Sequence, residues 1–304
     1  MPSLLRKVKT RLTIHAHRKV RGLLEGEYTS IFHGRSIDFD DLRHYVAGDE
    51  LKDIDWKATA RFGTPMTRRY IASRKHTVLI VADTGRNMAA LSAGGQPKVD
   101  VAIVAAGVVG HLAAKHGDLV GLVAGDAEHS EVRKPESTDA HLERLLQVMH
   151  ARTTLAAPPS ALLRQLSFVA KGFRRRMVLF VIADDRPLDR DEIDLLRRLA
   201  VQHEILWLTV GDVDPTEADH AAASMHDVHD DADIPAYLRS SASLRREFER
   251  AEAAAAARAA DVFESLAITR RRVEREDDVV PVLFALLHAH RHAHRRTPGG
   301  SRAR

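Results

Sequence analysis

HTVLIVADTGRNM, residues 76–88, decides the fold of this chain. Its centre, residues 78–82, is a continuous apolar run rich in β-branched side chains, which is typical of a strand with helices on both faces. The strand ends at Asp83, and in open α/β sheets ligands bind beyond the carboxyl ends of the strands. The stretch therefore predicts a buried parallel strand followed by a candidate binding loop.

After this stretch, short apolar runs alternate with longer helical patterns. Such alternation is the signature of βαβ units in a mostly parallel sheet with helices on both faces. We expect three further strands at residues 118–124, 177–183 and 204–210, and a candidate edge strand at residues 129–134. We expect helices at residues 99–116, 141–150, 160–170 and 190–201. The fold class predicted from this pattern is α/β.

The alternation divides the chain into three regions. Residues 1–75 lack it and are expected to form a smaller, separate N-terminal unit. Residues 76–275 make up the predicted α/β domain, including a long alanine-rich helix at about 235–266 and a last strand at 268–273. Residues 276–304 are expected to hold one more helix and then a disordered basic tail.

The composition indicates a globular protein and excludes the functions that depend on cysteine. The chain has 304 residues, 44% of them hydrophobic, and can bury one large core. It has no cysteine, which excludes disulfides, thiolate nucleophiles and zinc–cysteine sites and fits a reducing compartment. Residues 1–20 lack a secretion signal, and the longest apolar run, 101–110, is shorter than the ~20 residues of a membrane helix. We therefore expect a cytoplasmic protein without a transmembrane segment.

The ends of the chain are basic, whereas the net charge of +4 is small and does not require a nucleic acid partner. In the tail, histidines stand at every second position: His288, His290, His292 and His294. On a helix only pairs such as His288 and His292 would meet. We interpret this tail as a solvated segment or an adventitious metal binder.

The loop after the first strand resembles the first metal-site motif of von Willebrand factor type A domains, Asp-x-Ser-x-Ser followed by Met. Asp83 matches the motif, Gly85 replaces its first serine and Asn87 its second. The resemblance implies a von Willebrand factor type A-like, Rossmann-like fold with a degenerate metal-ion-dependent adhesion site and Mg²⁺ as the candidate ion. The implied donors are Asp83, Asn87, Thr153 or Thr154, and Asp184. Alternatively, Asp83 hydrogen-bonds the backbone of its own loop.

A second resemblance covers residues 26–70 and centres on GDELKDIDWKATAR, residues 48–61. It is similar to the hallmark of the bacterial domain-of-unknown-function family fifty-eight: Arg-x-Tyr, Gly-Asp, Ile-Asp-Trp and Ala-Arg, placed just before a von Willebrand type A-like strand. The matching positions are Arg43, Tyr45, Gly48, Asp49, Ile54, Asp55, Trp56, Ala60 and Arg61.

The residues of this hallmark alternate acidic and basic side chains around aromatic ones. Buried charges are stable only when paired, so we expect a network of ion pairs, with Trp56 as a buried apolar anchor whose N–H finds an acceptor. The hallmark either locks the N-terminal unit onto the sheet domain or binds a partner, and both roles are compatible.

These resemblances imply a non-enzymatic protein-interaction module. Members of the family are commonly encoded beside MoxR-type AAA+ ATPases, so the implied role is that of an adaptor or co-chaperone for such an ATPase. The phosphate-binding and nucleophile-elbow motifs of common hydrolases are absent from the sequence. The alternative is a Mg²⁺-dependent hydrolase that uses Asp83 and Asp184. A third reading, nucleic-acid binding through the basic termini, has the least support from charge.

Overall fold

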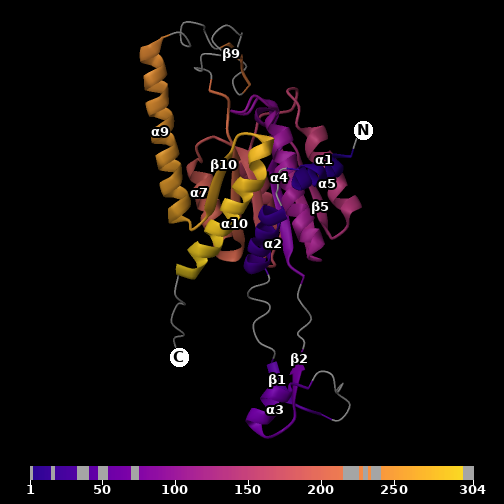
Figure 1. Cartoon of the computed structure of the whole chain (residues 1–304). Helices are drawn as coiled ribbons and strands as arrows, with labels where there is room; N and C mark the ends of the chain where they lie inside the picture. The colour runs from indigo at the N-terminus through magenta and orange to yellow at the C-terminus, as the bar shows by residue number, and fades with distance from the viewer. Residues whose placement is uncertain are drawn as a thin grey trace.

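The computed structural model describes residues 3–14, 18–32, 41–46, 54–69, 75–214, 226–228, 232–233 and 241–296. Its centre is a six-stranded sheet of order β10-β7-β6-β3-β4-β5. The two edge strands, β10 and β5, are labelled in Figure 1. The strands are β3 (Thr77–Asp83), β4 (Leu119–Gly125), β5 (Ser130–Glu136), β6 (Val178–Asp184), β7 (Glu204–Val210) and β10 (Thr269–Val273). All neighbours are parallel except β4 and β5, which are antiparallel. The predicted α/β fold class, a mostly parallel sheet, is confirmed, including the edge strand.

Helices cover both faces of this sheet. One face carries α1 (Leu4–Ile14), α2 (Arg18–Phe32), α4 (Lys98–Lys115), α5 (Asp139–Arg152) and α10 (Val279–Arg296). The other carries α6 (Leu162–Gly172), α7 (Arg190–Gln202) and the end of α9 (Ala242–Ser265). Short 3₁₀ turns, η2 (Arg86–Ala89) and η4 (Glu276–Asp278), precede α4 and α10. The helices predicted in the α/β region are present, with ends shifted by a few residues.

Strand β3 shows why the sheet needs helices on both faces. Val78, Ile80 and Ala82 belong to the core under α4, whereas Leu79 and Val81 belong to the core under α6 and α7. Successive side chains of a strand point to opposite faces, so an unbroken apolar run fills two cores at once. The run is therefore a central strand, as its pattern predicts.

The C-terminal part follows the predictions with two differences. Helix α9 begins at Ala242, and the earlier part of the predicted helix, up to residue 240, lies outside the described residues. Helix α10 continues to Arg296, so the histidine segment is helical, and the Nε2 atoms of His288 and His292 lie 3.2 Å apart. Residues 297–304, the predicted disordered end, lie outside the described residues.

Residues 1–75, expected as one unit, contain two differently packed parts. Helices α1 and α2 pack on the α/β body: Leu5, Val8 and Tyr28 are buried in the same core as the sheet. The Tyr28 hydroxyl donates to Asp118 Oδ2 at 2.8 Å, next to the start of β4. The apolar positions of α1 are spaced at three and four residues, so they form one helical face that needs a partner surface.

Residues 41–46 and 54–69, which the structure also describes in that region, form a small antiparallel unit. It comprises β1 (Asp41–His44), α3 (Trp56–Phe62) and β2 (Met66–Arg69), with β1 paired to β2. A second short pair, β8 (His226–Asp227) with β9 (Ala232–Asp233), precedes α9. Both units lie outside the alternating βαβ pattern.

The docking of α1 depends on Glu143 of α5, whose carboxylate accepts hydrogen bonds from the Leu4 and Leu5 amides at 3.0 and 2.8 Å. It thereby caps the first turn of a neighbouring helix. Glu143→Ala should lower the free energy of unfolding by about 1–2 kcal/mol, measured by urea unfolding at pH 7. Glu128→Ala, at an exposed position, is the control, and an equal loss for both variants would contradict the capping role.

The pH dependence of this effect has a definite sign. Partial burial opposes ionisation of Glu143, but the hydrogen bonds from Leu5, Ser3 and Leu4 outweigh it and lower the pKa of this carboxyl. The stabilisation is therefore present at neutral pH and is lost as the pH falls through the folded-state pKa. The difference between the wild type and Glu143→Ala should shrink under acidic conditions.

Candidate functional site

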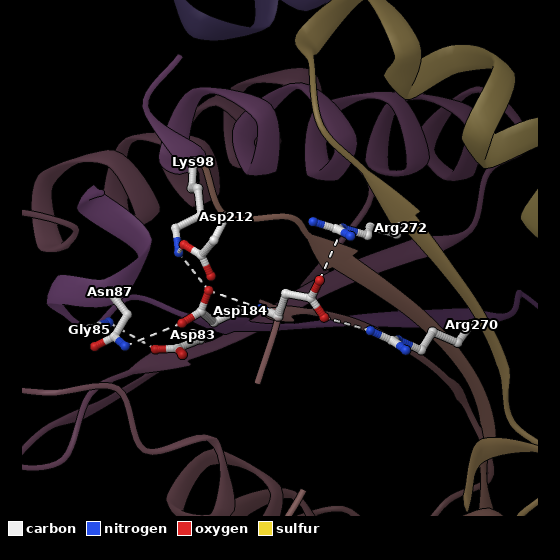
Figure 2. Close-up of polar contacts among 9 residues, drawn as sticks. Asp83, Gly85, Asn87, Lys98, Asp184, Asp212, Arg270 and Arg272 are labelled. Atoms are coloured by element: carbon white, nitrogen blue, oxygen red, sulfur yellow. Dashed lines mark hydrogen bonds and ion pairs between the residues drawn. The ribbon is translucent and has the colours of Figure 1, made fainter. Parts of the chain in front are cut away.

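Three loops meet at the carboxyl edge of the sheet. They follow β3, β6 and β7, which are neighbouring parallel strands. The first strand ends at Asp83 and the second at Asp184, and Asn87 in the loop after β3 donates from Nδ2 to Asp184 Oδ2 at 3.2 Å (Figure 2). The loop after β3 therefore lies beside the turn that bears Asp184, as the sequence predicts.

A lysine stands at the centre of this edge. Lys98, the first residue of α4, has a side chain that is 1% exposed, and its Nζ donates to Asp184 Oδ1 at 2.6 Å. The same ammonium contacts Asp212 Oδ1, in the loop after β7 (Figure 2). One cation thus connects the ends of two strands to the start of a helix.

The charges of these three groups are coupled. Burial opposes the charged form of Lys98, but Asp184 and Asp212 outweigh it and raise the pKa of the ammonium. Burial likewise opposes ionisation of Asp184, but Lys98 outweighs it and lowers the pKa of that carboxyl. Burial and the charge of Asp184 raise the pKa of Asp212. The pair Lys98–Asp184 is therefore the firmly ionised part of the cluster.

Sequence reasoning missed both Lys98 and Asp212. Lysine in the first turn of a helix opposes the helix dipole, so its presence directly after Pro97 signals nearby carboxylates. Asp212 follows Gly211 at the end of a predicted strand, so the rule for carboxyl edges could have identified it. Neither signal identifies which carboxylate would meet the lysine.

Asp83 bonds the backbone of its own loop. Its Oδ1 accepts from the Gly85 amide at 2.9 Å, and its Oδ2 has no hydrogen-bond partner in the part of the chain that the structure describes. Burial raises the pKa of Asp83 to about 6, against the opposing effects of the Gly85 amide and the Ser160 hydroxyl. Asp83 is thus a carboxyl group enclosed by protein, and burial disfavours its ionised form.

Gly85 is required by the close approach of a second loop. A Cβ atom at Gly85 would lie 2.5 Å from both the Cα and the backbone N of Ser160. The Arg86 amide also donates to the Pro158 carbonyl at 3.0 Å, which holds the two loops together. The position where the resembling motif has its first serine has no room for a side chain, and Ser160 lies there instead. No local pattern in the sequence indicated this residue.

Restoring the motif serine should therefore destabilise the protein. Gly85→Ser forces the loop at residues 158–160 to move, which should lower the free energy of unfolding by about 2 kcal/mol. Gly172→Ser is the matched control, because the atom nearest to a Cβ there is 3.7 Å away. Urea unfolding of both variants checks this, and a Gly85→Ser protein as stable as the control would show that the contact is loose.

The predicted threonine donors are placed differently. Thr153 ends α5, and its hydroxyl donates to the Met149 carbonyl at 2.8 Å. Thr154 is exposed. The residues present do not fit a Mg²⁺ site. Asp184 is already bound to the ammonium of Lys98, and the side-chain amide of Asn87 directs its N–H group toward Asp184. Among the described residues, no three His, Cys, Asp or Glu side chains are grouped so as to hold a metal ion.

Other charges at this edge are also paired. Asp185 accepts from Arg270 Nη2 at 2.8 Å and lies 3.0 Å from Arg272 Nε. Arg186 is paired with the fully buried Glu192. The cavity beside Asp83, beneath these pairs, measures about 10 Å³, about the room that one water molecule needs. The edge is thus a closed network rather than a substrate pocket.

The hallmark residues have local roles where they are described. Asp55 caps α3 by accepting from the Lys57 and Ala58 amides, both at 3.0 Å. The amide of Tyr45 donates to the Pro65 carbonyl at 2.8 Å, and the backbone of Arg43 pairs with Thr67. These contacts hold the small unit together internally.

The prediction that Trp56 is a buried anchor is wrong, because its side chain is 69% exposed. The buried residue of its short helix is Ala58, two positions further on, so the indole points to solvent. Arg61 is exposed as well. The part of the chain that the structure describes does not include Gly48, Asp49 or the side chain of Arg43. The ion pairs that we expected among these residues therefore stay a prediction.

Comparisons with known proteins agree with the hallmark. The family model described as "Protein of unknown function DUF58" matches residues 41–260, more than half of the chain. Uncharacterized protein Rv1480 of Mycobacterium tuberculosis (strain ATCC 25618 / H37Rv) is 27% identical over 223 residues, which cover 72% of this chain and 68% of that protein.

Among solved structures, the conserved hypothetical protein BatB from Bacteroides thetaiotaomicron has a TM-score of 0.45 at 14% identity, covering 71% of this chain and 98% of that one. A von Willebrand factor type A protein from Catenulispora acidiphila has a TM-score of 0.40 at 9% identity, covering 74% of this chain and 44% of that one. These TM-scores are too low to support an argument about the fold. The α/β architecture is established by the strand order of this chain itself. No described helix combines the length and apolarity that a membrane crossing requires.

Proposed function

The chain belongs to the DUF58 family of proteins of unknown function, and from that premise we propose that it is a non-enzymatic protein-interaction module. Its partner is a MoxR-type AAA+ ATPase in the cytoplasm, for which it acts as an adaptor or co-chaperone. The carboxyl edge of the sheet is the binding face. The partner is what the family resemblance implies, the compartment is the one expected from the sequence, and the geometry of the edge supports its choice as the binding face.

The proposal is supported by the side chains of the carboxyl edge, which combine buried ion pairs with exposed apolar residues. Apart from Asp83, the inner charges of the edge are paired with one another, whereas two large apolar side chains in its loops face solvent: Leu91 is 47% and Leu155 67% exposed. The Leu91 carbonyl accepts from the Val213 amide at 3.3 Å, which places this leucine beside the loop bearing Asp212. A rigid polar network with exposed apolar residues around it is suited to a protein surface.

The alternative, a Mg²⁺-dependent hydrolase using Asp83 and Asp184, has less support from the site. A hydrolase needs a shaped pocket and a water held near a metal or base. Here Asp184 is bound to Lys98, and the cavity beside Asp83 has room for about one water molecule. An interaction module needs neither feature.

The proposal is tested by co-purification. The tagged chain should capture the MoxR-type ATPase from native lysate at physiological salt, identified by mass spectrometry. Leu155→Asp should reduce the captured ATPase about tenfold, since a charge in an apolar contact costs at least 1.4 kcal/mol.

Val201→Asp is the matched control. Val201 is an 85% exposed apolar residue near the end of α7, at the opposite edge of the sheet. It should leave capture unchanged. Failure of the wild type to capture the ATPase would reject the partner, and equal losses for both variants would reject the binding face.

A further inference from the structure

We propose that Lys98 is the resident cation of the carboxyl edge, a side-chain ammonium in the place where a divalent ion would serve, and that the edge keeps its structure without metal. The lysine side chain is 1% and that of Asp184 6% exposed, so the pair is built into the protein rather than formed at its surface. This inference goes beyond the proposed function, because it holds for any partner.

Both carboxylate oxygens of Asp184 already accept hydrogen bonds from protein groups. Oδ1 accepts from Lys98 Nζ at 2.6 Å and from the Asp185 amide at 2.9 Å, while Oδ2 accepts from Asn87 at 3.2 Å. A divalent ion would have to displace the ammonium or lie beside it, where two positive charges repel each other. The carboxylate is therefore already satisfied.

The side-chain amide of Asn87 is oriented with its nitrogen toward Asp184. A carboxylate accepts hydrogen bonds, so the amide group that faces Asp184 Oδ2 is the N–H donor. A metal ligand must instead present an oxygen lone pair. Asn87 thus serves a site whose centre is an anion bound to an internal cation.

Lys98 lies in the first turn of α4. A cation in the first turn of a helix opposes the helix dipole and is stable there only when carboxylates compensate for it. Asp184 and Asp212 supply this compensation from the ends of β6 and β7. Lys98 thereby ties two strand ends to the start of α4, which is the structural task that a bound ion performs in a metal site.

The experiment begins with the wild-type chain, treated with chelator and then titrated with Mn²⁺. We expect no stoichiometric Mn²⁺ binding by electron paramagnetic resonance and a thermal midpoint that does not change between chelator and millimolar Mn²⁺. Stoichiometric binding that Asp184→Asn abolishes would overturn the proposal, since the site would then hold a metal despite its lysine.

The second arm removes the resident cation. Lys98→Ala leaves Asp184 and Asp212 facing an open space, so Mn²⁺ should raise the thermal midpoint of this variant by about 5 °C. The double variant Lys98→Ala/Asp184→Asn should not respond. If Lys98→Ala folds poorly, the yield of folded protein with and without Mn²⁺ replaces the midpoint. If Mn²⁺ changes neither the thermal midpoint nor the folded yield of Lys98→Ala, the proposal that the ammonium occupies the position of a metal ion is wrong.

Discussion

Replacing Lys98 with methionine is expected to lower the free energy of unfolding by about 3–5 kcal/mol. Methionine is similar in length, so the main change is the loss of charge. Asp184, whose side chain is 6% exposed, then remains as a buried carboxylate without its cation. Equilibrium urea unfolding at pH 7, followed by circular dichroism, measures this loss.

Two further variants identify the cause of that loss. Lys98→Met/Asp184→Asn removes the buried ion pair and should regain a large part of the stability, because the carboxylate that remains, Asp212, has a side chain that is 45% exposed to solvent. Lys134→Met, at an exposed position on β5, should change stability by less than about 0.5 kcal/mol. A loss for Lys98→Met no greater than for Lys134→Met would mean that the buried ion pair is absent in solution.

The second large effect is a gain of stability in Asp83→Asn that depends on pH. In the folded chain the pKa of Asp83 is about 6, above the ordinary value of 3.8, chiefly because the carboxyl is buried. The folded state therefore binds the proton more tightly, and stability falls as the pH rises from about 4 to about 6. Above that window the ionised carboxylate costs about 3 kcal/mol, from the roughly two-unit shift.

Asparagine removes this cost and keeps an oxygen that accepts the Gly85 amide. The variant should thus be about 2–3 kcal/mol more stable than the wild type at pH 8 and equal to it at pH 4. Urea unfolding at pH 4, 6 and 8 checks this. An Asp83→Asn variant that is less stable than the wild type at pH 8 would show that the charge of Asp83 is needed for folding.

Particular elements show how far the sequence could lead. The apolar runs at 78–82 and 177–183 predicted central strands because unbroken apolar runs need cover on both faces, and both strands are present. The edge strand at 129–134 was also predicted and forms β5. Trp56 was not predicted correctly, since aromatic size alone does not indicate which side of a short helix meets a neighbour.

The sequence by itself determined the α/β fold and the edge of the sheet at which the polar loops meet. Periodicity and strand ends are local properties, and parallel strands bring their carboxyl ends together. Only the tertiary structure decided that Lys98 binds Asp184, that Ser160 fills the space beside Gly85, and that α1 and α2 join the main core. These contacts join residues far apart in the chain, and their partners depend on packing and burial, which no local pattern specifies.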